Sequence, residues 1–363
     1  MVRAGNFYMN KKEFLDRVAR GECRLDSADA REVLDTVSIH DLGACGKKMR
    51  ARMHGNKAFY VYNQHVNYTN ICCNACKFCA FSKRPGQSGG YTMDMEELTR
   101  QIVSRQDEEI DELHIVGGLN PQLGYDYYLR MLETARSLRP RAWIKAFTAV
   151  EIAFLADTYG LSEERVLQDF RSAGLDMLPG GGAEVFAPGL RARICPEKIS
   201  GQRWLSIHEL AHSMGLRSNC TVLFGHVESW EDRLDHLEAL RRLQDKTGGF
   251  VCFIPLPYQP ENNPLKAKGP DGVDYTRMMA LSRLFLDNIP HLKAYWAFAG
   301  IKAAQLALHL GADDFDGTLI RERVGHAAGA DSPAGLTEPE LLGYIESAGF
   351  DAVRRDALFN PVS

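Results

Sequence analysis

The stretch Ile71-Cys72-Cys73-Asn74-Ala75-Cys76-Lys77-Phe78-Cys79 decides how the rest of this chain is interpreted, because it places four of the nine cysteines within eight residues. Reading from Cys72, the spacing to Cys76 and Cys79 is C-x3-C-x2-C. Three thiolates from one loop can hold three irons of a 4Fe-4S cube, whereas ferredoxin-type electron carriers supply a fourth cysteine. The next cysteine is Cys195. The spacing therefore predicts a cluster with one iron left open to a small molecule.

Other uses of these cysteines fit the sequence less well. A zinc site takes four ligands, usually as two separated C-x2-C pairs or with histidines at defined spacing, and no second pair exists here. A structural disulfide would suit a secreted chain, but the opening Met1-Val2-Arg3-Ala4-Gly5-Asn6 contains no apolar signal segment. Because Cys72 and Cys73 are adjacent, the set Cys73, Cys76 and Cys79 remains an alternative to the set that begins at Cys72.

The composition is that of an ordinary globular protein, with 45% hydrophobic and 25% charged residues. The net charge of −4 implies no overall attraction to nucleic acid or to an anionic membrane. No apolar run approaches the 18 or more residues of a membrane span. Nine cysteines without a secretory signal predict a reducing, cytoplasmic location. We therefore expect a cytoplasmic protein with no nucleic-acid or membrane partner, and the sequence leaves its oligomeric state open.

Hydrophobic periodicity predicts a helical N-terminal extension (residues 1–56) and then alternating strands and helices. The predicted strands are 58–63, 113–116, 143–148, 175–178, 219–224, 250–256, 291–298 and 313–316. The predicted helices are 93–109, 126–138, 149–174, 184–195, 201–215, 229–246, 274–288, 301–310 and 337–347, with Ser162 as an N-cap.

This order implies an α/β fold with a parallel sheet and right-handed crossovers. Eight strand-helix units favour a closed (β/α)8 TIM-type barrel over residues 57–335, with 336–363 as a C-terminal helix and tail packing on it. A doubly wound open sheet is the alternative.

In a (β/α)8 barrel the active site lies in the loops that follow the strands. Gly117 and Gly118 follow the second strand, where glycines let backbone groups approach a ligand closely, although such a pair also makes an ordinary tight turn. Glu151 follows the third strand, where its carboxylate could accept hydrogen bonds from sugar hydroxyls or simply stabilise a helix N-terminus. Gly181 and Glu184 follow the fourth strand in the same manner. His226 after the fifth strand, and His65 and Asn67 before the cysteine loop, lie where a substrate would be held.

Several stretches resemble the aminodeoxyfutalosine synthase family. This family belongs to a subgroup of the radical S-adenosylmethionine (SAM) superfamily, which also contains other menaquinone enzymes of the futalosine pathway and the deazaflavin synthases. The stretches, which spread over about residues 45–330, are Asn70–Phe81, His114–Pro121, Ile144–Glu151, Leu178–Glu184, Ile194–Ile199, Gly225–Glu228 and Asp316–Thr318. The resemblance implies a radical SAM barrel in which Cys72, Cys76 and Cys79 hold the 4Fe-4S cluster. Cys73 departs from the family pattern, because an aliphatic residue is expected there.

The resemblance also implies roles for residues in the loops. Those expected to bind SAM are Phe78, Gly117, Gly118, Asn120, Glu151, Gly181 and Glu184. Those expected to bind the substrate are His65, Asn67, Lys145 and Thr318, and His226 is the expected catalytic residue. Gly118 in particular is expected to leave space for the methionine end of SAM.

The implied reaction uses SAM as a co-substrate. A reduced cluster cleaves SAM, and the 5′-deoxyadenosyl radical adds to the vinyl carbon of 3-[(1-carboxyvinyl)oxy]benzoate. The aryl group then migrates, bicarbonate is lost and 6-amino-6-deoxyfutalosine forms. A reductant such as flavodoxin or ferredoxin is required. The alternatives are the cyclase of the same pathway (dehypoxanthine futalosine cyclase), a deazaflavin synthase or, outside enzymes, an iron–sulfur electron carrier.

Overall fold

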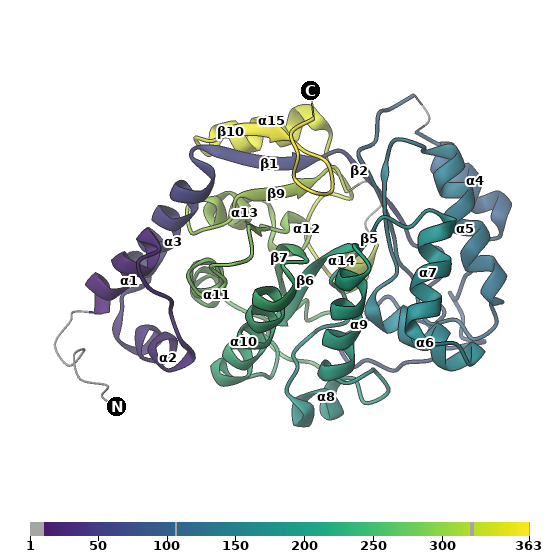
Figure 1. The fold of residues 1–363 in the computed structure, drawn as a ribbon, viewed down its shortest axis with the longest axis horizontal. Coiled ribbons are helices and arrows are strands. Elements are labelled where there is room, and N and C mark those ends of the chain that lie inside the picture. The colour runs from purple at the N-terminus through teal and green to yellow at the C-terminus, as the bar shows by residue number, and fades with distance from the viewer. Residues whose placement is uncertain (1–10, 106, 320–322, 363) are drawn as a thin grey trace.

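The computed structural model describes residues 11–105, 107–319 and 323–362, so the first ten residues of the predicted N-terminal extension lie outside the description. The rest of that extension forms three helices, α1 (Lys11–Arg20), α2 (Ser27–Thr36) and α3 (Ile39–His54). They gather at one end of the molecule (Figure 1). The longest, α3, packs closely against the barrel, because a Cβ on Gly46 would lie 2.1 Å from the carbonyl oxygen of Leu310.

Parallel strands form the centre of the fold. They are β1 (Lys57–Val61), β2 (Asn63–Val66), β3 (Glu112–Ile115), β4 (Trp143–Ala146), β5 (Met177–Leu178), β6 (Arg217–Phe224), β7 (Phe250–Pro257), β8 (His291–Leu292), β9 (Asp314–Gly317) and β10 (Asp351–Arg354). A curled seven-stranded sheet has the order β2-β3-β4-β5-β6-β7-β8, and a three-stranded sheet has the order β10-β1-β9.

The two sheets are joined into one ring. A parallel bridge between Lys293 and Asp314 connects the end of β8 to β9, and β9 pairs with β1, which continues directly into β2. The hydroxyl of Thr318 donates to the carbonyl oxygen of Asn63 (2.8 Å) and closes the seam. The predicted TIM-type barrel is therefore confirmed, and the doubly wound open sheet is not the fold.

Most of the helices after α3 cover the outside of the ring (Figure 1), whereas the short helices α12 and α14 contribute Phe298 and Val324 to the cavity lining. The helices after α3 are α4 (Met95–Val103), α5 (Tyr125–Leu138), α6 (Ala149–Tyr159), α7 (Glu163–Ala173), α8 (Pro188–Ile194), α9 (Gly201–Ser213), α10 (Trp230–Thr247), α11 (Gly272–Phe285), α12 (Trp296–Ala299), α13 (Ile301–Leu308), α14 (Val324–Ala327) and α15 (Glu338–Ser347). None of the helices in the described part of the chain is long and apolar enough to cross a membrane.

Three of the differences between predicted and observed elements have a clear physical reason. The predicted strand 58–63 is interrupted at Tyr62, whose backbone N–H donates to Asp111 instead (Oδ2, 3.1 Å). The predicted strand 291–298 ends early, because Trp296 begins the short helix α12 and its indole N–H donates to the carbonyl of Gly317 (3.0 Å). The predicted helix 149–174 is two helices, which are separated by Gly160 in the left-handed region (φ 63°) and by the predicted N-cap Ser162.

Candidate active site

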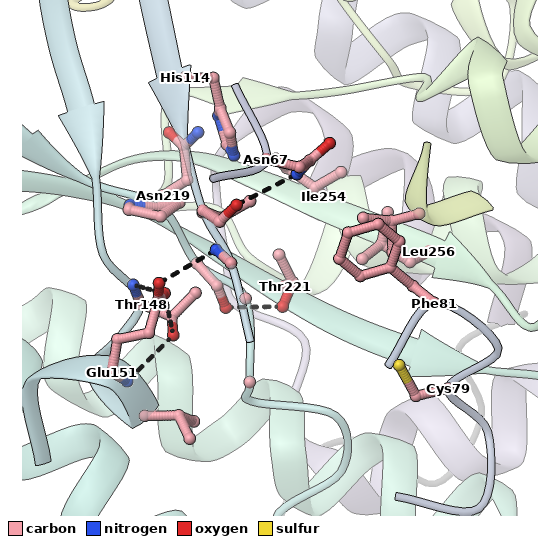
Figure 2. A pocket seen from close by; sticks show the side chains of 18 of the residues that line it. Asn67, Cys79, Phe81, His114, Thr148, Glu151, Asn219, Thr221, Ile254 and Leu256 are labelled. Carbon is pink, nitrogen blue, oxygen red and sulfur yellow. Dashed lines mark hydrogen bonds between the residues drawn. The ribbon is translucent and has the colours of Figure 1, made fainter. Parts of the chain in front are cut away.

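A cavity of about 320 Å³ opens at the carboxyl ends of the barrel strands. Its walls come from β2, β3, β4, β6 and β7 and from the loops that follow the strands. Figure 2 shows Cys79 and Phe81 on one side of the view and Thr148 and Glu151 on the other. The position agrees with the sequence-based expectation for a (β/α)8 barrel.

Three of the four clustered cysteines reach this cavity. Cys72, Cys76 and Cys79 line it, and all three thiols are free of disulfides. Among the described residues Cys73 is not part of the lining, and its Sγ lies 3.9 Å from Asn74 Oδ1. Burial raises the pKa of Cys76 to about 12, although the Lys198 ammonium opposes this shift. Among the described residues these three are the cysteines that line the cavity, and three thiols fit a 4Fe-4S cluster with one open iron.

Backbone hydrogen bonds hold the cysteine loop against two other loops. The N–H of Cys72 donates to Lys83 O (2.9 Å), and that of Cys73 donates to Leu119 O (2.9 Å). Gly118 is required by this packing, since a Cβ there would lie 2.2 Å from the carbonyl oxygen of Ile71. The expectation that space beside Gly118 belongs to a ligand therefore needs correction: the cysteine loop occupies it. At Gly117 a Cβ would meet the Tyr68 ring at 2.7 Å.

Glu151 lines the cavity but already has protein partners. Its Oε2 accepts from the N–H and hydroxyl of Thr148 in a capping box at the start of α6. Its Oε1 accepts from the Tyr68 hydroxyl (2.9 Å) and from the Gly117 N–H (3.2 Å). Burial raises the pKa of this carboxyl group, and these donors oppose the shift. Glu151 thus stabilises the N-terminus of α6, as one of the two sequence-based interpretations predicted, and it also lies on the cavity wall.

The loop after β5 places an ion pair beside the cysteines. Gly181 and Glu184 line the cavity, and Glu184 adopts the left-handed region (φ 50°), which costs a non-glycine residue conformational energy. Glu184 Oε1 lies 2.7 Å from Lys198 Nζ, which lies 5.2 Å from the centre of the Phe78 ring. Burial lowers the pKa of Lys198, but the neighbouring Cys76 and Glu184 charges outweigh it and raise the pKa overall.

Ionisable side chains also form the inner wall of the cavity. Lys145 Nζ lies 2.6 Å from Glu112 Oε1, and Lys293 pairs with Asp316. We call these four residues the floor cluster. Burial lowers the pKa of Lys145, while Lys145 and Lys293 together outweigh burial and lower that of Glu112 to about 2.

A pair of stacked imidazole rings lies on the same inner wall. The rings of His65 and His114 are 4.6 Å apart with an interplanar angle of 18°. Both residues line the cavity, and so does Asn67, whose side-chain amide donates to the carbonyl oxygen of Val116 (3.1 Å). His65, Asn67 and Lys145 therefore lie where substrate contacts were expected.

Sequence reasoning missed several lining residues, although a signal for them exists. Side chains at alternate positions of a strand point to the same face. Polar residues recur with this period: Asn63 and His65 in β2 and Asn67 just after it, Glu112 and His114 in β3, and Asn219 and Thr221 in β6.

Three predicted site residues are placed elsewhere in the described structure. The side chain of His226 is fully buried outside the cavity lining, with Nε2 3.1 Å from Leu223 O and Nδ1 accepting from the Val227 N–H (2.7 Å). Asn120 uses its side chain locally, since its amide donates to Thr92 Oγ1 (2.8 Å) and its Oδ1 accepts from the Gln122 N–H (3.0 Å). Thr318 closes the barrel seam. Their polar atoms serve the fold at these positions.

Comparisons with known proteins agree with the barrel and the three-thiol cavity. Residues 66–240 match the radical SAM superfamily, and residues 247–362 match the CofH/MqnC C-terminal region. Methylornithine synthase (PylB) has the same fold, with a TM-score of 0.75 at 16% identity over 94% of this chain and 97% of that chain. The hydrogenase maturase HydG from Carboxydothermus hydrogenoformans gives 0.74 at 13% identity, over 96% and 80% of the two chains.

Full-length relatives narrow the group. Aminodeoxyfutalosine synthase from Thermus thermophilus is 41% identical over 96% of this chain and 94% of its own length, and the Streptomyces coelicolor enzyme is 38% identical over 96% and 93%. A 5-amino-6-(D-ribitylamino)uracil–L-tyrosine 4-hydroxyphenyl transferase from Methanopyrus kandleri is 36% identical over 86% of both chains. The chain therefore belongs to the radical SAM superfamily, in the group that contains these enzymes. Members of this superfamily use a 4Fe-4S cluster and SAM.

Proposed function

We propose that this chain is an aminodeoxyfutalosine synthase, which joins the 5′-deoxyadenosyl group of SAM to 3-[(1-carboxyvinyl)oxy]benzoate with aryl migration and loss of bicarbonate. The observation that carries the proposal is one cavity that joins three free thiols to a polar inner wall. The relatives at 41% and 38% identity support this substrate over others in the group. The polar wall suits a substrate with two carboxylates.

The residues of the chain divide the cavity between SAM and substrate. Cys72, Cys76 and Cys79 would hold the cluster, which when bound supplies the electron that cleaves SAM. The carboxylate of Glu184 lies near Cys76, and the backbone of Gly181 and the carboxylate of Glu151 also line the cavity, where SAM would bind.

The substrate would lie deeper, against the inner wall. His65, Asn67 and Lys145 can donate hydrogen bonds to carboxylate oxygens there. Apolar side chains from β7, Ile254 and Leu256, form another part of the wall (Figure 2). They exclude water from the space between the two substrates, and reacting atoms held about 3–3.5 Å apart gain most from such positioning.

The test is product identification. The reconstituted enzyme is incubated anaerobically with SAM, dithionite and 3-[(1-carboxyvinyl)oxy]benzoate, and the products are analysed by mass spectrometry. We expect the product to be 6-amino-6-deoxyfutalosine, which contains the adenosyl moiety of SAM. Parallel incubations with dehypoxanthine futalosine, and with tyrosine plus 5-amino-6-(D-ribitylamino)uracil, serve as controls. Turnover of either control substrate in place of the first would assign the chain to another activity of the group. Without SAM-dependent chemistry on any of them, the chain would be an electron carrier.

A further inference from the structure

The ion pair of Glu184 and Lys198 is buried beside the cysteine loop. Only 11% and 12% of the two side chains are exposed, and both line the cavity together with the three cluster ligands. Burying an ion pair costs desolvation energy that the attraction between its charges often fails to exceed, so a buried pair is weak evidence of a role in stability. Glu184 is also held in the left-handed region (φ 50°), at a conformational cost. The pair therefore calls for another explanation.

A backbone contact holds the segment that carries Lys198 directly against the cysteine loop. The N–H of Lys77 donates to the carbonyl oxygen of Ile194 (2.8 Å), four residues before Lys198. Lys198 Nζ itself lies 5.2 Å from the centre of the Phe78 ring. Lys77 and Phe78 both lie between two of the cluster ligands in the sequence. The ammonium is thus fixed beside the loop that would hold the cluster.

The charge of Lys198 acts on two of the three cluster ligands. Burial raises the pKa of Cys72 and that of Cys76, and the Lys198 ammonium opposes the shift at both thiols. At Cys76 the ammonium has a larger effect than the carboxylate of Glu184, which acts in the opposite direction. The buried pair therefore leaves a net positive potential at this ligand.

A second ion pair near the cysteine loop is exposed instead of buried. Glu197 accepts a hydrogen bond from the Ala75 N–H (3.2 Å), and its other oxygen lies 3.7 Å from an Arg84 guanidinium nitrogen. The side chains of Arg84 and Glu197 are 48% and 42% exposed, so water and salt screen their charges. Charges in a buried site are screened much less. The buried pair is therefore the one whose charges act more strongly on the ligands.

We infer that the Glu184–Lys198 pair sets the reduction potential of the cluster held by the three cysteines. Three thiolate ligands make this cluster an anionic centre, and one further electron adds to its negative charge. The fixed Lys198 ammonium stabilises the reduced form, and the Glu184 carboxylate opposes this effect. A one-electron donor such as dithionite is oxidised in the step, and no covalent bond changes. The inference goes beyond the proposed reaction, because it concerns the protein before SAM or substrate binds.

The experiment measures the midpoint potential of the cluster-loaded protein without SAM or substrate. Wild type, Lys198→Met and Glu184→Gln are titrated anaerobically with dithionite and redox mediators, and reduction is followed by electron paramagnetic resonance. Each substitution removes one charge with little change in side-chain size. We expect Lys198→Met to make the cluster at least about tenfold harder to reduce, which lowers the potential by about 59 mV for one electron. Glu184→Gln should raise the potential by a smaller amount.

Two further variants separate charge from packing. Lys198→Met/Glu184→Gln removes both charges, so its potential should lie between those of the single variants. Lys145→Met is the matched control, because Lys145 is also buried in this cavity and lies 2.6 Å from a glutamate oxygen. The charges that act most on Lys145 belong to the floor cluster. Its removal should therefore shift the potential by less than half as much as Lys198→Met does.

Iron content is measured first, so that variants are compared at equal cluster loading. Shifts of the same sign in the two single variants, an unchanged potential in Lys198→Met or an equal shift in Lys145→Met would each overturn the inference. If Lys198→Met does not load a cluster, Glu184→Gln still decides, since a potential at or below that of wild type would contradict the assigned role. The result is separable from the identity of the reaction proposed above, because no substrate is present.

Discussion

Two buried charge clusters lie close to each other inside the barrel, and they differ in how completely their polar atoms are paired. The base cluster consists of His54, Arg283, His291 and Asp313. Asp313 is fully buried, and its oxygens contact Arg283 Nη2 (2.6 Å), the Leu292 N–H (2.8 Å) and His291 Nδ1 (2.6 Å). Arg283 also donates to the carbonyl of Gly311 (2.9 Å).

The floor cluster also pairs carboxylates with cations, but it leaves polar atoms without a partner. Asp316 Oδ2 is buried without a hydrogen-bond partner among the described residues, and so is Asn219 Oδ1, which lines the same cavity. Asp316 also adopts the left-handed region (φ 69°). Unpaired buried polar atoms are rare in folded proteins and call for an explanation. The comparison indicates that the base cluster serves stability and that the floor cluster is prepared for a ligand.

The largest effect is expected from loss of a cluster ligand, which should abolish function without changing the stability of the cluster-free protein. Cys79→Ala should abolish loading of the 4Fe-4S cluster and all SAM cleavage, because one of three ligands is lost. Cys73→Ala is the matched control and should keep most of its iron and activity. Iron content and electron paramagnetic resonance measure loading, and both variants should unfold at the temperature of the cluster-free wild type. Loss of the cluster in Cys73→Ala, with retention in Cys72→Ala, would assign the ligand set to Cys73.

The second effect tests the base cluster. Arg283→Met leaves the Asp313 carboxylate buried without its main cation, which should lower the free energy of unfolding by about 3–5 kcal/mol. Arg242→Met removes an arginine whose side chain is 77% exposed and paired with Glu238, so it should cost less than about 1 kcal/mol. Urea unfolding of the cluster-free proteins measures both. Equal losses in the two variants would contradict a stabilising role for the base cluster.

A third, smaller effect is a pH dependence that arises in the base cluster. Burial lowers the pKa of His54 to about 4, with Arg283 and His291 adding to the shift and Asp313 opposing it. The unfolded chain therefore binds a proton near pH 6.5 that the folded chain excludes until about pH 4, so stability falls as pH falls through this window. The contribution is about 3 kcal/mol. His54→Gln should flatten the unfolding free energy between pH 6.5 and 4 relative to wild type. Parallel pH profiles would show that His54 titrates equally in both states.

The smallest effect is expected at the floor cluster. Lys145→Met removes a cation from the cavity wall, but Lys293 and Arg355 still lower the pKa of Glu112, so we expect a smaller loss of stability than in Arg283→Met. We expect KM for 3-[(1-carboxyvinyl)oxy]benzoate to rise about tenfold (about 1.4 kcal/mol) while KM for SAM is unchanged. Steady-state kinetics under anaerobic conditions measure both constants. An unchanged KM for the benzoate substrate would place Lys145 with the structural ion pairs.

Much of the barrel could be predicted because its signals are local. Strand and helix periods follow from side-chain geometry, and capping by Ser162 depends on the three residues that follow it. Errors occurred where a distant contact outweighed local preference. At Trp296, burial of the indole and its hydrogen bond to Gly317 favour a helical turn over a continued strand. At Gly118, the carbonyl of Ile71 occupies the space that had been assigned to a ligand.

The site residues also divide into those that local sequence predicts and those that depend on distant contacts. His226, Asn120 and Thr318 are polar residues in the expected loops, but each side chain contacts nearby backbone or side-chain atoms instead of the cavity. Apart from Lys145, which was expected to bind the substrate, the floor cluster was missed because Glu112, Lys145, Lys293 and Asp316 belong to four different parts of the chain. No local sequence pattern indicates that these four residues lie close together in the fold.

By itself the sequence determined the cluster motif, the order of strands and helices and the end of the barrel that carries the loops, because spacing and periodicity depend on neighbours along the chain. Only the tertiary structure decided which polar residues face the cavity and which are used by the fold. The physical reason is that a buried polar group takes the nearest partner in space, and closure of the ring brings β9 beside β1 and β8.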